Sequence, residues 1–298
     1  MKNFCLLALF TFSFLFGHTQ KTDKKLETKL KEIIAGFNGD IGIYVKDLRR
    51  GKTISINADT IFPTASIVKV PILLGIMDKI QRGELSYDST LAYKDSLLYE
   101  GEDILGSFKN NEKILLKKVM MLMLTTSDNT ASLWLQSLAG KGTRINEILD
   151  SLGLVYTRVN SRTPGRENNR TQYGWGQTTP KEMGIIFEKI YRNEIFSAAA
   201  CDRMMRSLGR NYWDLNEEIS QIPPYIEVFS KNGCVNAVRS EVLLVNAPHN
   251  PYIFCIFTKN NKDTQWNHNN EAWTMARKIS SMLWNYFEPK DKWEAPMK

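Results

Sequence analysis

Hydrophobic and polar residues follow two different periods along this chain of 298 residues. Apolar side chains recur at helical spacing in some segments, whereas in others they alternate with the two-residue period of a strand. The chain is predicted to begin with a helix at 23–36 and two strands at 40–48 and 53–56. A long helical block follows at 66–210, then three strands at 226–230, 241–245 and 252–258, and a final helix at 271–287.

This order predicts an α+β fold with two lobes. No crossover helix separates the last three strands, so hairpin connections and an antiparallel five-stranded sheet are expected. The N-terminal and C-terminal helices would flank this sheet, and an all-helical lobe would be inserted between its strands. The predicted sheet lobe comprises 21–62 and 211–298, and the helical lobe comprises 63–210. A cleft between two such lobes is a common place for an active site.

The first twenty residues have a different character from the rest. Lys2 precedes an apolar run at 4–16, and the chain becomes polar at 18–20. This pattern predicts a secretory signal peptide over 1–20, and its apolar run is too short to span a bilayer comfortably. We therefore expect an exported protein, periplasmic or secreted, that is not inserted in the membrane once the signal is removed.

Charge and composition narrow the function classes. The formal net charge is +7, but lysines and arginines are scattered, which is typical of solvated faces and does not favour nucleic-acid binding. Three cysteines follow the signal segment, Cys201, Cys234 and Cys255, and their wide spacing fits neither a disulfide framework nor a metal site. We expect no metal and no organic cofactor.

Histidine is too scarce to supply the usual base of a serine hydrolase. Only His249 and His268 follow the signal segment, both in polar turns or loops. The chain contains neither a His-x-x-x-His pattern nor a Gly-x-Ser-x-Gly elbow. If the protein is a hydrolase, its base is a different residue type.

The first candidate motif is Ser-Ile-Val-Lys at 66–69, at a predicted helix start. Residues three apart share one helix face, so the Ser66 hydroxyl and the Lys69 amine can meet. A serine hydroxyl is a poor nucleophile until a base takes its proton, and a partly buried lysine can lose its own proton and serve. Because a chain this long contains roughly one Ser-x-x-Lys by chance, the motif needs support.

Two further motifs supply that support. Ser-Asp-Asn at 127–129 offers Ser127 as a proton relay and Asn129 as an amide for a substrate carbonyl. Lys-Asn-Gly at 231–233 follows a predicted strand. Each also has an ordinary structural explanation, because Ser, Asp and Asn are natural helix N-caps and Asn-Gly is a common hairpin turn. The order of all three motifs, at a helix start, a loop and a strand, favours function.

The third motif suggests groups that would hold a substrate. Lys231 would bind a substrate carboxylate near Ser127, and Gly233 would let an edge strand approach the substrate backbone. The N–H of Cys234 would then form an oxyanion hole with the N–H of Ser66.

The three motifs together resemble the class A β-lactamase family and its penicillin-binding relatives. The resemblance covers nearly all of 21–298 and includes Thr-Thr-Pro at 178–180, which opens a helix. It implies a β-lactamase/transpeptidase-like fold, an acyl-enzyme mechanism and a small-molecule β-lactam or cell-wall peptide as substrate. We expect the protein to act as a monomer.

The resemblance also implies a role for individual residues. Ser66 would be the acylated nucleophile, Lys69 its base partner and Ser127 the proton shuttle. The residues that would position the substrate are Asn129, Lys231, Asn232 and, at its carboxylate, Arg239.

Two positions depart from the family pattern. Asn232 stands where the family usually has Thr or Ser. The loop at 162–176 contains one carboxylate, Glu167, and Thr171 occupies the place of the family's water-holding Asn. Nearby arginines would depress the pKa of Glu167. Glu167 is therefore the candidate base for hydrolysing the acyl-enzyme, and efficient turnover is the open part of the prediction.

Three functions fit these residues. The leading one is an exported β-lactamase-like serine hydrolase that cleaves the amide bond of β-lactams. The first alternative is a D-Ala-D-Ala-type peptidase, amidase or esterase that uses the same groups. The second is a penicillin-binding sensor that becomes acylated at Ser66 and stays acylated.

Overall fold

The computed structural model describes residues 22–101, 103–209, 211–213 and 217–296. The predicted signal peptide at 1–20 lies outside these ranges. Every helix within them is too short or too polar to cross a lipid bilayer.

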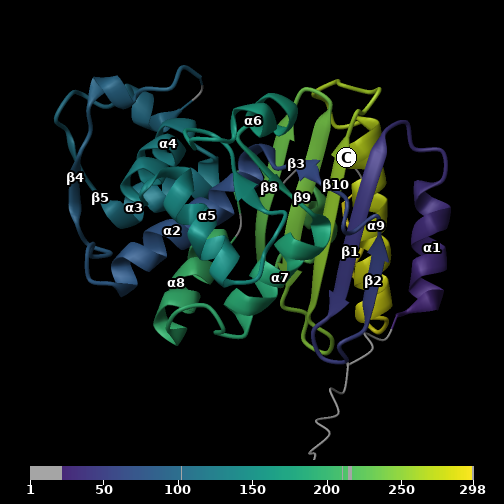
Figure 1. Cartoon of the computed structure of the whole chain (residues 1–298). Helices are drawn as coiled ribbons and strands as arrows, with labels where there is room; N and C mark the ends of the chain where they lie inside the picture. The colour runs from purple at the N-terminus through teal and green to yellow at the C-terminus, as the bar shows by residue number, and fades with distance from the viewer. Residues whose placement is uncertain (1–21, 102, 210, 214–216, 297–298) are drawn as a thin grey trace, which may run out of the picture.

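Five antiparallel strands form the main sheet, in the order β2-β1-β10-β9-β8. They are β1 Asp40–Asp47, β2 Thr53–Ile56, β8 Val228–Val235, β9 Val238–Val245 and β10 Tyr252–Lys259. The first two strands come from the N-terminal part of the chain and the other three from the C-terminal part, and Figure 1 shows them in one layer. The predicted antiparallel five-stranded sheet is confirmed.

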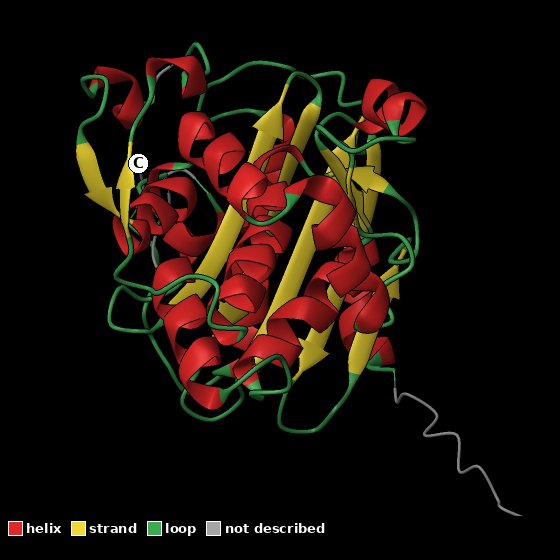
Figure 2. Cartoon of the chain, turned by 60° about the vertical axis from the view of Figure 1, so that its left-hand side comes forward, coloured by secondary structure: helices red, strands yellow, loops and turns green. Residues whose placement is uncertain are grey.

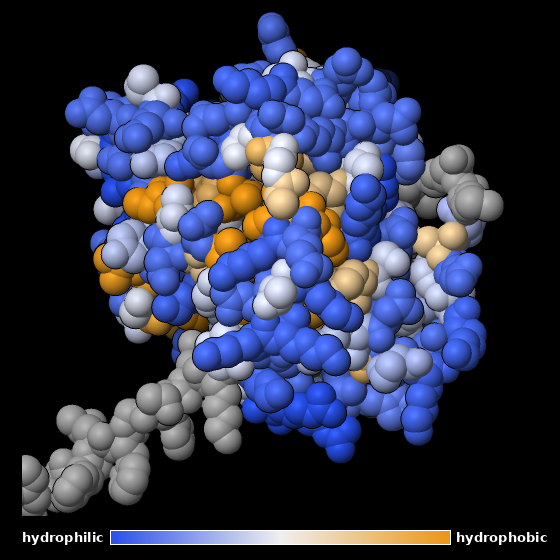
Figure 3. All heavy atoms as spheres, turned by 90° about the vertical axis from the view of Figure 1, so that its right-hand side faces the viewer, coloured by the Kyte–Doolittle hydropathy of each residue, from blue (hydrophilic) through white to orange (hydrophobic). Residues whose placement is uncertain are grey.

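Helices cover both faces of this sheet. α1 (Lys24–Ile34) and α9 (Glu271–Phe287) lie together on one face (Figure 1), as predicted for the two terminal helices. Their apolar stripes, which include Leu30 and Trp284, are buried against the strands. α7 (Pro180–Tyr191) packs against β1 and β10. The surface on the α1 side is mostly hydrophilic, with hydrophobic residues near its centre and along the left part of the view (Figure 3).

The helices of the second lobe lie beside the sheet (Figures 1 and 2). They are α2 Lys69–Gln81, α3 Leu116–Met121, α4 Asn129–Leu138, α5 Lys141–Ser151, α6 Glu167–Tyr173 and α8 Ala198–Leu208. α2 is the central helix, because every residue from Lys69 to Asp78 is buried. It packs closely on its neighbours at Gly75, where a Cβ atom would come within 2.8 Å of side-chain atoms of Ala139 and Ile145.

Short elements complete the fold. Two small antiparallel sheets are formed by β3 Phe62–Pro63, β7 Gly176–Thr178 and β6 Arg158–Val159, and by β4 Thr90–Ala92 and β5 Lys113–Leu115. The short helical turns are η1 Ala65–Val68, η2 Asp95–Leu97, η3 Ile104–Ser107, the π-helical η4 Leu122–Thr126 and η5 Glu218–Gln221.

The Lys-Asn-Gly motif lies inside β8 and is not a hairpin turn. The turn between β8 and β9 follows at Asn236, whose φ of 41° lies in the left-handed region. Gly233 faces η1, and a Cβ atom there would lie 2.4 Å from the carbonyl oxygen of Thr64 and 3.1 Å from the nitrogen of Ile67. Only glycine allows β8 to come this close to the turn that carries Ser66.

We expect Gly233→Ala to lower the free energy of unfolding by about 1–3 kcal/mol, because the added methyl group meets backbone atoms that cannot move away cheaply. Urea denaturation followed by circular dichroism measures the change. Gly209→Ala is the matched control, since no atom lies closer than 3.5 Å to a Cβ built there. Equal stability of both variants would contradict this explanation of the glycine.

Candidate active site

The candidate nucleophile stands at the junction of a strained turn and the central helix. Ala65 has a φ of 43°, which is unusual for a residue with a side chain. Ser66 follows in η1, and Lys69 begins α2. The Lys69 Nζ atom lies 3.2 Å from the Ser66 Oγ atom. The predicted contact three residues apart is therefore present.

Lys69 is fully buried and its amine is surrounded by oxygen atoms. Besides Ser66, the Nζ atom lies 2.5 Å from the Ser127 carbonyl oxygen, 2.9 Å from the Ser127 Oγ atom and 2.9 Å from the Asn129 Oδ1 atom. An amine with two N–H groups can donate to the carbonyl and amide oxygens and turn its lone pair towards a hydroxyl. The arrangement therefore suits a neutral amine that receives a proton.

The electrostatic surroundings favour this neutral state. Burial is the largest cause that holds the pKa of Lys69 well below its usual value, and the nearby positive charge of Lys231 adds to it. Asp103 and Asp128 act in the opposite direction but do not outweigh these effects. The structure thus favours the loss of a proton from Lys69, and its predicted role as base partner of Ser66 stays a prediction.

The backbone around Ser127 is shaped to present its hydroxyl. The π-helical turn η4 ends at Ser127, which has a φ of 61°. Asp128 accepts a hydrogen bond from the N–H of Ala131 at 2.7 Å and so caps α4, and it also accepts one from the N–H of Leu105 at 3.0 Å. Asp128, the middle residue of the Ser-Asp-Asn motif, therefore has a structural role. The side chains of Ser127 and Asn129 on either side of it contact Lys69.

Asp103 is a positioning residue that the sequence analysis missed. It accepts hydrogen bonds from the N–H of Asn129 at 2.9 Å and from the N–H and hydroxyl of Thr130 at 2.7 and 3.0 Å. It lies in the segment that joins β4 to β5, and its hydrogen bonds hold this segment against the start of α4. No motif or periodicity marks it, because it lies in a polar, acidic segment.

Lys231 and Asn232 interact with one another on β8. The Lys231 Nζ atom donates to the carbonyl oxygen and the Oδ1 atom of Asn232, at 3.0 and 2.9 Å. The Asn232 Nδ2 atom in turn donates to the Oε1 atom of Glu217 at 3.3 Å. The residue that departs from the family pattern thus connects the motif lysine to a carboxyl group.

These groups surround a pocket of about 330 Å³. Six predicted residues line it: Ser66, Ser127, Asn129, Asn232, Gly233 and Cys234. The other residues that line it are Asp103, Thr126, Trp213, Glu217, Trp266, Asn267, His268 and Trp273. Lys69 and Lys231 are fully buried and are not among the lining residues.

Glu167 is not brought to this pocket. It is exposed at the start of α6, and its carboxylate accepts a hydrogen bond from the N–H of Gly165 at 3.1 Å. It lines a separate hollow together with Lys141 and Arg170. Its predicted role in deacylation stays a prediction.

Arg239 supports a wall of the pocket from behind. Its guanidinium group lies 4.3 Å from the ring centre of Trp266 and 4.7 Å from that of Trp273. It also donates to the carbonyl oxygens of Thr264 and Gln265, at 3.2 and 3.1 Å. These contacts fix the 264–268 loop, and Arg239 is not among the residues that line the pocket.

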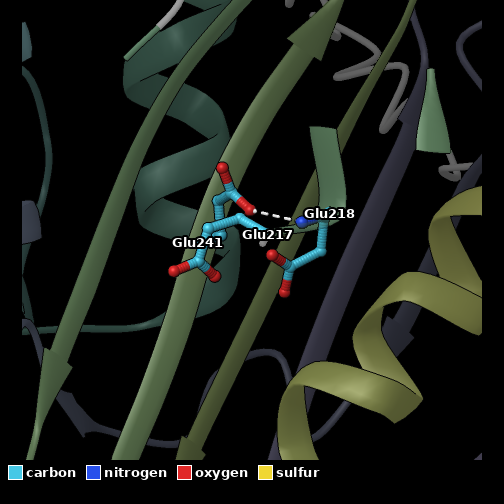
Figure 4. Close-up of side chains that lie close together, drawn as sticks. All are labelled: Glu217, Glu218 and Glu241. Atoms are coloured by element: carbon cyan, nitrogen blue, oxygen red, sulfur yellow. Dashed lines mark hydrogen bonds between the residues drawn. The ribbon is translucent and has the colours of Figure 1, made fainter. Parts of the chain in front are cut away.

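Three buried carboxyl groups form an acidic cluster at the pocket: Glu217, Glu218 and Glu241 (Figure 4). The N–H of Glu218 donates to the Oε2 atom of Glu241 at 3.1 Å. Burial and the neighbouring Glu218 raise the pKa of Glu217 to about 8. Lys231 and Arg239 act in the opposite direction on Glu217. The positive charges around the cluster thus balance part of its negative charge.

Cysteine is not positioned as the nucleophile. Cys201, Cys234 and Cys255 are free thiols. Burial, assisted by Glu217, raises the pKa of the Cys234 thiol well above its usual value. A protonated thiol is a weak nucleophile, so the contribution of Cys234 to the pocket is its backbone.

The fold and this pocket are those of the penicillin-recognising serine hydrolases. The chain belongs to the β-lactamase enzyme family, whose family model matches residues 25–287. The curated relatives include β-lactamase VEB-1 of Pseudomonas aeruginosa, which is 22% identical over 293 residues, or 95% of this chain and 97% of the relative. A β-lactamase of Bacteroides uniformis is 24% identical over 195 residues, or 64% of this chain and 65% of the relative.

Solved structures show the same fold. A single-residue mutant of PBP-A, in an acyl-enzyme complex with penicillin G, has a TM-score of 0.79 at 22% identity, and the match covers 91% of this chain and 98% of that one. A β-lactamase from Chitinophaga pinensis has a TM-score of 0.79 at 18% identity, with 88% and 99% covered.

We expect Glu217→Gln to remove a pH-dependent loss of stability. The pKa of this carboxyl rises from 4.5 to about 8 on folding, so its contribution to stability is complete below pH 4.5 and is lost as the pH rises through about 8. The stability of the variant relative to wild type therefore increases between pH 5 and 8, by up to about 1.4 kcal/mol per pH unit.

Urea denaturation at pH 5, 6.5 and 8 measures this difference. Glu194→Gln is the matched control, because Glu194 is exposed in the turn after α7, where its carboxylate lies 3.7 Å from the Lys189 Nζ atom. A constant difference between Glu217→Gln and wild type across this range would contradict the raised pKa.

Proposed function

We propose that this protein is exported and forms an acyl-enzyme at Ser66 with β-lactams or with related cell-wall peptides. The observation that carries the proposal is the buried amine of Lys69, which contacts the hydroxyl groups of both Ser66 and Ser127. A lysine held neutral between two hydroxyl groups can take a proton from one and pass a proton to the other. The apolar run at 4–16 supports export.

The order of the reaction steps can be derived from these contacts. The neutral Lys69 amine takes the Ser66 proton as the Oγ atom attacks the carbonyl carbon of the substrate amide. The negative charge that forms on the carbonyl oxygen is stabilised by the N–H groups of Ser66 and Cys234. As the C–N bond breaks, Ser127 donates its proton to the departing nitrogen and receives one from the Lys69 ammonium. Lys69 is neutral again, and the acyl group is bonded to Ser66.

Residues on both sides of the pocket would orient the substrate. Asn129 lies at the start of α4 and Asn232 on β8, and both line the pocket. Both can bond to amide groups of a substrate. The predicted carboxylate contacts of Lys231 and Arg239 stay predictions.

Hydrolysis of the acyl-enzyme is proposed to be the slow step. Deacylation needs a base and a water molecule beside the acylated serine. Glu167, the predicted base, is exposed and lines a different hollow.

We expect the purified chain 21–298 to gain the mass of benzylpenicillin when the two are mixed, and to lose it slowly. Intact-mass spectrometry over time follows both steps. Ser66→Ala is the control and should gain no mass. An adduct that disappears as fast as it forms, with hydrolysis of the drug, would contradict the slow step and establish an efficient lactamase. If no adduct forms that depends on Ser66, the proposed function is wrong.

We expect Glu167→Gln to release the acyl group within about twofold of the wild-type rate, because the exposed carboxylate does not line the Ser66 pocket. The same mass measurement gives the rate of loss of the adduct. A decrease of about 100-fold or more, with unchanged acylation, is the loss typical of a missing general base and would restore the predicted role of Glu167.

A further inference from the structure

A second hollow lies on the face of the sheet that α1 and α9 cover. Its volume is about 750 Å³, compared with about 330 Å³ for the Ser66 pocket. α9 supplies most of its lining, α1 contributes Lys29 and η5 contributes Gln221. The surface on this side of the molecule is mostly hydrophilic (Figure 3). This hollow, the α9 groove, is large enough for a ligand and is separate from the three motifs.

The charge of the α9 groove has one sign. Among the described residues that line it, every charged side chain is positive: Lys29, Arg277 and Lys278. Lys29 and Lys278 are exposed and form no ion pair with another described residue. On the same helix as Lys29, by contrast, Lys31 pairs with Glu27 at 2.6 Å. The charges of Lys29 and Lys278 therefore remain for an anionic ligand.

The α9 groove is elongated. Thr274 and Lys278 also line an adjoining hollow of about 370 Å³ that reaches the end of α1. The carboxylate of Glu271 lines this second hollow, where it accepts hydrogen bonds from the N–H and Nδ2 groups of Asn38, at 3.1 and 3.0 Å. Together the hollows follow α9 from Glu271 to Tyr286, a length of about 22 Å at 1.5 Å per residue. This shape suits a chain-like ligand.

Neutral hydrogen-bonding side chains contribute much of the remaining lining. Thr274, Ser281 and Asn285 lie on one face of α9 at helical spacing, together with Lys278, and Gln221 adds an amide from η5. Hydroxyl and amide groups both donate and accept, so they can bond to the hydroxyl groups of sugar rings. An acyl chain would need a predominantly apolar lining. The groove therefore favours a polar anionic chain over an anionic lipid.

The elements around the groove also argue against an acidic peptide. Extended peptides commonly bind by adding a strand to a sheet edge, and helical peptides bind in apolar grooves. The edge strands of the main sheet are β2 and β8, and neither is among the described elements that line the α9 groove. A saccharide chain needs no strand edge, because side chains alone can satisfy its hydroxyl groups.

The α9 groove and the Ser66 pocket come close together at the start of α9. Trp273 lines the pocket, and the next residue, Thr274, lines the groove. Arg277 is 8% exposed and donates to the carbonyl oxygen of His268, a residue that lines the pocket, at 2.6 Å. A polymer bound in the groove would therefore keep the Ser66 pocket close to the surface to which the polymer belongs.

We propose that the α9 groove binds an acidic polysaccharide, that is, a saccharide chain whose rings carry carboxylate groups. Lys29 and Lys278 would form charge-assisted hydrogen bonds with these carboxylates, and the hydroxyl and amide side chains would bond to the ring hydroxyls. The choice of an extracellular polymer rests on the export proposed above, whereas binding in the groove does not depend on acylation of Ser66.

The test compares three ligands by isothermal titration calorimetry with the purified chain 21–298. They are hexagalacturonate, its full methyl ester, which has the same sugar rings without charge, and hexaglutamate, which carries carboxylates on a peptide chain. We expect hexagalacturonate to bind about tenfold or more tightly than either of the other two, because it alone offers both the charges and the ring hydroxyls.

Three variants locate the site. The double variant Lys29→Gln/Lys278→Gln should bind hexagalacturonate about tenfold more weakly, because it loses two ion pairs. Lys113→Gln/Lys118→Gln is the matched control, since both lysines are exposed in the helical lobe and the net charge changes by the same amount. Ser281→Phe keeps every charge and fills the groove, so it should weaken binding by a similar factor. Circular dichroism checks that each variant is folded.

Each outcome either supports or overturns the polysaccharide site. Equal affinity for the methyl ester would exclude a role for the carboxylates, and equal affinity for hexaglutamate would favour an acidic peptide. An equal loss in the two lysine pairs would mean general charge attraction, and unchanged affinity in Ser281→Phe would place the ligand elsewhere. Absence of binding would also overturn the proposal.

The proposed function is tested separately. Ser66→Ala should bind hexagalacturonate as tightly as wild type, although it cannot be acylated. If benzylpenicillin forms no adduct but hexagalacturonate binds as expected, the proposed acylation is wrong and the polysaccharide site stands. If the adduct forms but the saccharide does not bind, only the polysaccharide site is overturned.

Discussion

A buried lysine amine is the constraint on which the rest of the site depends. Moving an ammonium ion out of water is costly unless it is paired, and a lysine in such a place tends to lose its proton. Lys69 is fully buried, and the charge with the largest effect on its pKa is another cation, Lys231. The two lysines thus have a joint effect, because the charge of one keeps the other neutral and ready to act as a base.

The architecture of both lobes serves this arrangement. β8 carries Lys231 to the nucleophile, and it can do so only because Gly233 has no side chain to meet the carbonyl oxygen of Thr64. On the helical side, Asp103 holds the backbone at Asn129, and the left-handed conformation of Ser127 turns its hydroxyl and carbonyl towards Lys69. The base is therefore assembled from segments 58 to 60 residues apart, and the contact between the lobes fixes its pKa.

The sequence could predict the parts of this site that depend on local spacing or on a recognisable motif. Ser66 and Lys69 are three residues apart on one turn, so their contact follows from helix geometry. Asp103 has no such signal, and its importance appears only when its loop is placed against α4. Glu241 lies in an apolar run that predicts a strand, but only the strand register, which pairs it with Asn232, brings it to Glu217 and Glu218. Long-range pairing is the information that periodicity lacks.

The same register gives the pocket its distinctive chemistry. Asn232 bonds to Lys231 on one side and to Glu217 on the other. It therefore lies between the cation that lowers the pKa of Lys69 and a carboxyl group that lines the pocket. A threonine or serine at this position has one hydroxyl group, whereas the asparagine amide offers a separate donor and acceptor for these two partners. The departure from the family motif thus links the motif lysine to the buried acids through one side chain. Through this link, Asn232 couples the charge of Glu217 to the lysine that lowers the pKa of Lys69.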